Sequence, residues 1–170
     1  EMVIWNPSKP LGGLTPEELD RATIILWEGY CSVHTRFTEQ QILEARRADP
    51  AVSILVHPEC TPEVVEAADF IGSTEFISKK VREAASGSSW GIGTEINLVT
   101  RLAEENPDKK VFCLDPVVCP CATMYRVHPA YLLWILDGLN AGVVINQIKV
   151  PDEIAFDAKI ALERMIEVSS

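Results

Sequence analysis

Short apolar runs alternate with amphipathic segments along most of this chain, and this alternation predicts its fold class. The apolar runs are predicted to be β-strands and lie at 23–27, 52–56, 69–72, 90–93, 110–114 and 143–148. The run at 23–27, TIILW, is predicted to be a buried strand. Short apolar strands that alternate with helices indicate an α/β fold with parallel sheets.

Residues that favour helix N-termini stand between the apolar runs. Thr15 is followed by Pro16 at the first helical position, and Thr38 is followed three residues later by Gln41, which makes a capping box. Helices are predicted to begin near Thr15, Thr38, Thr61, Ser73, Thr94, His128 and Pro151. Most of these starts closely follow an apolar run, as a repeated strand–helix unit requires.

Length, charge and cysteine content exclude several classes of function. The 170 residues are enough for one compact domain or two small ones. The net charge of -10 argues against nucleic acid or an anionic membrane surface as the main partner. No apolar run approaches the roughly 20 residues of a membrane helix, and residues 1–6 show no signal-peptide pattern. Five cysteines are too sparse for a disulfide-stapled domain, so a cytoplasmic protein with free thiols is expected.

The segment VFCLDPVVCPCATM at 111–124 holds three of the five cysteines. Pro116 and Pro120 break regular structure there, which places Cys119 and Cys121 on a loop. Two cysteines separated by one residue are too close for a zinc knuckle of the Cys-x-x-Cys type. The spacing suits a single thiolate offered to a metal or cluster, and it equally suits two partly buried loop thiols.

Three predicted strands end in polar residues that stand out from their surroundings. They are Cys31 with His34, His57 with Glu59, and Ser73 with Thr74. Ligands of open α/β sheets bind beyond the carboxyl ends of the strands, so these side chains are expected to converge on one site.

Each pair has a chemical reading and an ordinary structural one. Cys31 offers a metal-ligating sulfur, and the imidazole and carboxylate of His57 and Glu59 can move a proton near neutral pH. Ser73 and Thr74 offer hydroxyls at a helix start that can bind a carboxylate or phosphate. Taken singly, the same residues also fit a loop thiol, a solvated strand end and a helix N-cap. Cys60 precedes a helix and is either activated or buried, and Cys113 is expected in the core.

Read together, these motifs resemble the quinolinate synthase family. The matching segments are ILWEGYCSVHTRFT at 25–38, ILVHPECTPEVVEAADFIGST at 54–74, GTEINLVTRLAEENPDKKV at 93–111, CPCATM at 119–124 and VPDEIAFDAKIALERMI at 150–166. The segment CPCATMYRVHPAYLLWIL is similar to the corresponding segment of the longer enzymes of Bacillus-like bacteria. The resemblance covers nearly all of the chain beyond Thr15.

The resemblance implies a fold of three similar three-layer α/β domains with parallel sheets around a pseudo-threefold axis, of which this chain holds the C-terminal two. The expected divisions are a strand tail and loop at 1–14, a partial second domain at 15–72 and a third domain with a C-terminal helix at 73–170. It further implies a [4Fe–4S] cluster that acts as a Lewis acid in condensing iminoaspartate with dihydroxyacetone phosphate, with loss of phosphate and two waters. L-aspartate oxidase would supply the iminoaspartate.

The resemblance also assigns roles to individual residues. Cys31 and Cys121 would ligate the cluster, and Cys121 is preferred to Cys119 because Met124 keeps the family's spacing after the last ligand. His57 and Glu59 would perform acid–base work, while His34, Ser73 and Thr74 would bind substrate. The third cluster ligand is expected in an N-terminal part that this chain lacks, so the chain is expected to be inactive alone. Two alternatives are a thiol metal-binding or redox module and a purely structural α/β domain.

Overall fold

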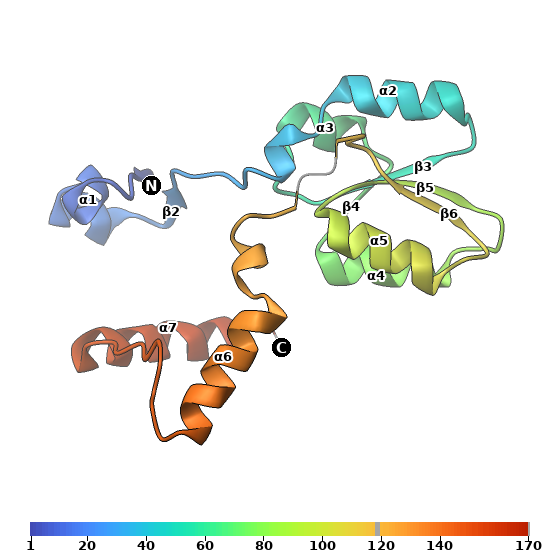
Figure 1. Ribbon diagram of the computed structural model, residues 1–170. Helices are drawn as coiled ribbons and strands as arrows, with labels where there is room; N and C mark the ends of the chain where they lie inside the picture. The colour runs from blue at the N-terminus through green and yellow to red at the C-terminus, as the bar shows by residue number, and fades with distance from the viewer. Residues whose placement is uncertain (118–119, 170) are drawn as a thin grey trace. The chain divides into compact units, whose positions relative to one another are not determined.

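The computed structural model describes residues 1–117 and 120–169 (Figure 1). The chain divides into two compact units, Glu1–Met124 and Tyr125–Ser170.

A four-stranded parallel sheet forms the centre of the first unit. Its strands are β3 (Ser53–Val56), β4 (Phe70–Ile71), β5 (Ser89–Gly93) and β6 (Lys110–Cys113). Their order across the sheet is β4-β3-β5-β6, and Leu55 of β3 lies opposite Phe70 on one side and Ile92 on the other. The four corresponding apolar runs are therefore confirmed as parallel strands. Their carboxyl ends share one edge of the sheet.

Helices cover both faces of this sheet and make a three-layer α/β arrangement (Figure 1). The helices are α2 (Glu39–Ala48), α3 (Pro62–Ala67), α4 (Thr74–Glu83) and α5 (Ile96–Glu105). Ile54 and Val56 pack in a core with side chains of α2 and α3, whereas Leu55 packs in a second core with side chains of α4 and α5. This alternation is the two-residue period of a strand buried on both faces.

The N-terminal part of this unit holds a separate pair of parallel strands. Strand β1 (Met2–Trp5) pairs with β2 (Ile24–Trp27), and the 3₁₀ turn η1 (Pro10–Gly13) and helix α1 (Pro16–Arg21) lie between them in sequence. The predicted strand at 23–27 is thus confirmed, but the prediction that it is buried is wrong. Its four residues are 44–67% exposed, because a two-stranded sheet has only one neighbouring strand and little to cover its faces.

The second unit consists of the 3₁₀ turn η3 (Met124–Arg126, which begins at the boundary), helix α6 (Pro129–Asn140) and helix α7 (Asp152–Ser169). The strand predicted at 143–148 is wrong: these residues form the connection between the helices, with Asn146 at φ 59. An apolar run becomes a strand only where another strand pairs with it, and the sheets of the described residues contain β1 to β6 alone.

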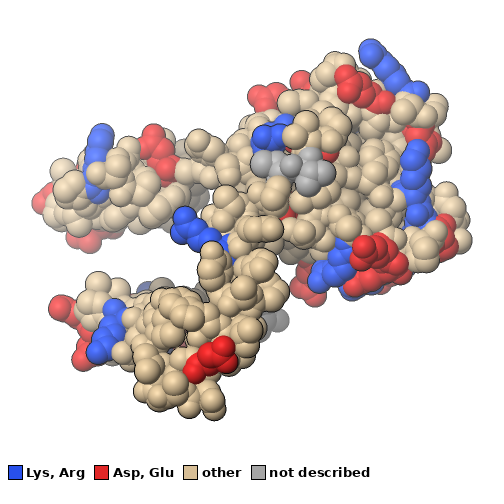
Figure 2. Space-filling model, viewed as in Figure 1, with Lys and Arg blue, Asp and Glu red and all other residues tan. Residues whose placement is uncertain are grey.

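Apolar side chains dominate the exposed surface of α6. Tyr131, Leu132, Leu133, Trp134, Leu136 and Leu139 are each more than half exposed, and Figure 2 shows mostly uncharged atoms over this helix. Within the described residues, no helix has the length and apolar character to span a membrane.

The predicted domain divisions at 14/15 and 72/73 stay predictions. In the structure β3 and β4 pair with each other and β3 pairs with β5, so a single sheet extends across position 72/73. The pseudo-threefold relation between domains likewise remains an expectation.

Candidate functional site

Two histidines and a glutamate meet at the carboxyl edge of the four-stranded sheet. Oε2 of Glu59 lies 2.9 Å from Nδ1 of His34 and 3.8 Å from Nδ1 of His57. The two imidazole rings are stacked, with centroids 4.3 Å apart and planes inclined by 9°. The sequence placed these residues at two strand ends, and the fold brings them into direct contact.

Local structure explains how His34 reaches this position. It begins the 3₁₀ turn η2 (His34–Arg36), and its neighbours Val33 and Phe37 are buried in the core beneath. The side chain of Arg36 in the same turn binds Asp115, at the end of β6, with an Nη2–Oδ2 distance of 3.0 Å. These contacts anchor the turn on both sides, and His34 is itself only 7% exposed.

The ring nitrogens of the two histidines have distinct partners. His34 directs Nδ1 at the Glu59 carboxylate and Nε2 at the hydroxyl of Thr94, 3.1 Å away. A carboxylate only accepts hydrogen bonds, so neutral His34 carries its proton on Nδ1 and accepts at Nε2 from Thr94. The backbone N–H of Glu59 donates to Nδ1 of His57 (3.2 Å), which leaves the proton of neutral His57 on Nε2.

Burial lowers the pKa of His57 below its usual value. The neighbouring His34 lowers the pKa further, and the Glu59 carboxylate opposes both effects. The neutral ring is therefore the form favoured near pH 7.

Cys31 joins this cluster. Its Sγ, a ring nitrogen of His34 and a carboxylate oxygen of Glu59 all lie within 4.8 Å of one another. Cys31 and Glu59 also line an open cavity of about 450 Å³ together with Trp27, Gly29 and Tyr30. The sulfur, nitrogen and oxygen donors can together bind a transition metal, and the cavity gives small molecules access to them.

Cys121 lies on the loop that follows β6, and a buried carboxylate holds this loop. The backbone N–H of Cys121 donates to Oε1 of Glu95 (3.3 Å), and Glu95 also caps helix α5 by accepting from Asn97. Cys31 and Cys121 are both half-buried and pack against the same core. The other cysteine of the motif, Cys119, lies outside the described residues.

Comparison with known proteins decides the family of this chain. Residues 1–167 match the family model described as quinolinate synthetase A protein. The chain belongs to the quinolinate synthetase A family. Proteins named quinolinate synthase are similar to it: that of Corynebacterium glutamicum is 56% identical over 168 residues, and that of Nocardioides sp. 52% over 166. That of Geobacillus thermodenitrificans is 46% identical over 170 residues.

These alignments cover 98–99% of this chain but only 42–46% of the relatives. The chain thus spans less than half the length of the curated quinolinate synthases it matches. The family membership expected from the sequence motifs is confirmed.

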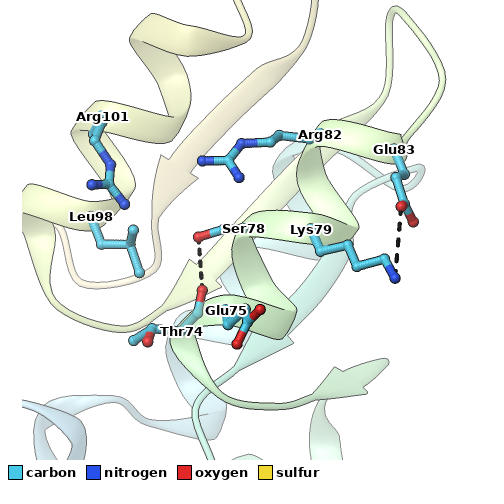
Figure 3. Close-up of a pocket in the computed structure, with 8 residues that line it drawn as sticks. All are labelled: Thr74, Glu75, Ser78, Lys79, Arg82, Glu83, Leu98 and Arg101. Atoms are coloured by element: carbon cyan, nitrogen blue, oxygen red, sulfur yellow. Dashed lines mark hydrogen bonds and ion pairs between the residues drawn. The ribbon is translucent and has the colours of Figure 1, made fainter.

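Two residues that the family resemblance assigned to substrate binding lie one strand away from the histidine pair. Ser73 follows β4, and its hydroxyl accepts the N–H of Phe76 as the N-cap of α4 (3.3 Å). Thr74 begins α4 and lines a groove of about 590 Å³ between α4 and α5 (Figure 3). Their assignment as substrate-binding residues stays a prediction.

The groove between α4 and α5 is the larger hollow, but its basic side chains are already paired. Figure 3 shows Lys79 beside Glu83, at 4.0 Å. Arg82 and Arg101 both lie near Glu105, at 3.2 and 3.8 Å. Within the described residues, the lysine and arginine side chains of this groove are thus each close to a carboxylate of the same protein.

The remaining described thiols are less suited to chemistry. Burial raises the pKa of Cys60 to about 12, and its Sγ lies 3.6 Å from the carbonyl oxygen of Gly93. Of the two readings of Cys60 from sequence, the buried one is therefore observed. Burial also raises the pKa of Cys113, whose Sγ lies 3.9 Å from the Thr94 carbonyl oxygen.

Sequence reasoning missed Thr94 and Glu95, which it treated only as a helix start. Both are buried at the end of β5, the strand next to β3. Thr94 orients His34, and Glu95 holds the Cys121 loop. The strand-end rule that selected His57 and Glu59 would also have selected them.

Proposed function

We propose that this chain forms part of a quinolinate synthase, which condenses iminoaspartate with dihydroxyacetone phosphate and releases phosphate and two waters. The observation that carries the proposal is the convergence of Cys31 with His34, His57 and Glu59 at one sheet edge, in a chain of this family. A metal-binding thiol next to groups that can transfer protons is the combination that condensation and dehydration require.

The donor set fits an iron–sulfur cluster. Thiolates are the usual ligands of such clusters, and Cys31 and Cys121 are free thiols, partly exposed and packed against one core. We assign both as ligands of a [4Fe–4S] cluster, with a further ligand in the part of the relatives that this chain does not match. When bound, the cluster would supply a Lewis acid that polarises substrate oxygen.

The neighbouring side chains divide the proton transfers between them. Glu59 is the proposed base, because its carboxylate is exposed at the cavity wall and accepts a hydrogen bond from His34. Neutral His57 is the proposed donor through Nε2–H, because its Nδ1 is already engaged by the Glu59 N–H. A neutral imidazole held in one orientation can donate to a developing oxyanion without adding a full charge.

The remaining proposed roles are the binding of substrate anions and the supply of iminoaspartate. Ser73 and Thr74 would bind substrate carboxylate or phosphate oxygens at the start of α4, with His34 as a further substrate contact. L-aspartate oxidase would supply the unstable iminoaspartate. A reducing cytoplasm suits exposed cluster-ligating thiols.

The test is quinolinate formation by the complete polypeptide after anaerobic assembly with iron and sulfide. The unmodified protein should form quinolinate from the two substrates, and His57→Asn should lower kcat/KM roughly a hundred- to ten-thousand-fold. His128→Asn is the matched control, because His128 caps α6 in the other unit and Asn is also a good N-cap. Absence of quinolinate from the unmodified protein would refute the proposed activity.

A further inference from the structure

Cys31, His34 and Glu59 form a donor set that can bind a single metal ion without any other cysteine. Their three ligand atoms lie within 4.8 Å of one another. One sulfur, one imidazole nitrogen and one carboxylate oxygen suit Zn²⁺ and the related divalent ions Co²⁺ and Fe²⁺. We propose that the protein without its iron–sulfur cluster binds one such divalent ion through Cys31, His34 and Glu59.

Metal binding requires the three ligand atoms, which now lie within 4.8 Å of one another, to adjust their spacing. In a tetrahedral zinc site with bonds of about 2.0–2.3 Å, neighbouring donor atoms are roughly 3.3–3.6 Å apart. The present separation of 2.9 Å between His34 Nδ1 and Glu59 Oε2 is that of a hydrogen bond, so the two atoms must move slightly apart. Glu59 can supply this movement because its side chain is 57% exposed.

The hydroxyl of Thr94 already contacts the His34 nitrogen that would face away from the metal. Thr94 lies 3.1 Å from Nε2, and Thr94 itself is 1% exposed. When the metal replaces the proton on Nδ1, the proton of the neutral ring moves to Nε2 and is donated to the Thr94 hydroxyl oxygen. The Cys31 thiol releases its proton as it ligates. The His34 ring keeps its single proton, which shifts from Nδ1 to Nε2, and the Cys31 thiol loses one, so the net release is one proton.

Two of the other described thiols, Cys60 and Cys113, are poorly placed to replace Cys31. Cys60 is 6% exposed, and its Sγ is directed at the Gly93 carbonyl oxygen. The Cys113 Sγ lies 3.9 Å from the Thr94 carbonyl oxygen, and the pKa of this thiol is raised by burial. Cys31 is the described cysteine grouped with His34 and Glu59.

The site has a consequence that rests on the proposed function. Cys31 cannot ligate a single divalent ion and the cluster at the same time. Zn²⁺ bound here would therefore compete with cluster assembly.

Cobalt titration of the complete, cluster-free polypeptide under anaerobic conditions tests the site. Co²⁺ bound by a thiolate gives a sulfur-to-cobalt charge-transfer band, which reports the sulfur ligand directly. The expected result is one Co²⁺ per chain, displaced by Zn²⁺. Cys31→Ser should abolish the charge-transfer band, and Glu59→Gln should weaken Co²⁺ binding tenfold or more.

The Cys121→Ser variant distinguishes metal binding at this site from metal binding by the two proposed cluster cysteines. The proposal expects its Co²⁺ affinity and band intensity to equal those of the unmodified protein. Equal loss in Cys121→Ser and Cys31→Ser, unchanged binding in Glu59→Gln, or no Co²⁺ binding at all would each overturn the proposal. Because this experiment needs no cluster and no substrate, its outcome is independent of whether the protein forms quinolinate.

Discussion

Glu59 connects the two histidines of the candidate site, since its Oε2 lies 2.9 Å from one ring and 3.8 Å from the other. Glu59→Gln keeps the size of the side chain but removes its charge and its capacity to accept a proton. We expect quinolinate formation to fall roughly a hundred- to ten-thousand-fold, because the proposed base is lost. Steady-state kinetics of the cluster-loaded protein measure this.

The matched control for that variant is Glu66→Gln, an exposed glutamate on the helix that follows Glu59. Its kcat/KM should be unchanged. Equal kinetics of the Glu59→Gln and Glu66→Gln proteins would remove Glu59 from the mechanism.

The thiols should differ in reactivity. Burial raises the pKa values of Cys60 and Cys113, so both remain protonated near neutral pH, and the thiolate is the reactive form. In cluster-free, metal-free protein, iodoacetamide should modify Cys31 and Cys121 before Cys60 and Cys113, as followed by peptide mass spectrometry. Modification of Cys60 as fast as that of Cys31 would contradict this order.

The sequence identified which residues can carry out chemistry better than it identified the residues that contact them. His57 and Glu59 could be selected because they follow an apolar run directly. The contact between Glu59 and His34 joins residues 25 positions apart, and that between His34 and Thr94 joins residues 60 positions apart. Such contacts depend on the order of strands in the sheet, which no local pattern encodes.

Among the elements, β3 carries the largest share of the core. Ile54 is fully buried in the cluster shared with α2 and α3. Ile54→Ala should lower the free energy of unfolding by about 2–5 kcal/mol, because it removes buried methyl groups and leaves a cavity. Chemical denaturation measures this, with Leu43→Ala on α2 as control, since Leu43 is 47% exposed. Similar losses in both variants would contradict the assigned packing.

Helix α5 and the cysteine loop are coupled through Glu95. Its carboxylate accepts the N–H groups of Asn97 and Cys121. Glu95→Gln keeps the shape but weakens these charge-assisted hydrogen bonds. We expect faster backbone hydrogen exchange at 121–124 and a lower iron content after reconstitution, with no change in exchange at β3. Unchanged exchange at 121–124 would show that Glu95 does not hold the loop.

Elements were predicted well where local signals and pairing agreed. The capping box at Thr38 and Gln41 forms as expected at the start of α2. The strand prediction at 143–148 was wrong because hydrophobic periodicity and composition cannot show whether a neighbouring strand exists. Strand β2 formed but is exposed, since apolar composition favours burial only where another layer covers the strand.

For the whole molecule, alternation of strands and helices was enough to predict parallel α/β architecture. Parallel strands place their carboxyl ends at one edge, which explains why the residues after β3 and β5 lie together. His34 follows β2 of the separate two-stranded sheet and reaches this edge through the turn η2. The family motifs added the assignment of Cys121, which composition and spacing left open. The division of the chain at Met124 could not be read from the sequence, since it depends on long-range contacts.

We propose that Cys31 and Cys121 ligate a cluster that serves the histidine–glutamate site. Anaerobic reconstitution of the complete polypeptide, with iron, sulfide and quinolinate measured on the same samples, tests this assignment. We expect about four iron and four sulfide ions per chain, with quinolinate formation, in the unmodified protein and in Cys113→Ala. Both the cluster and the activity should be lost in Cys31→Ser and Cys121→Ser. Full iron content and full activity in either serine variant would show that the substituted cysteine is not a cluster ligand.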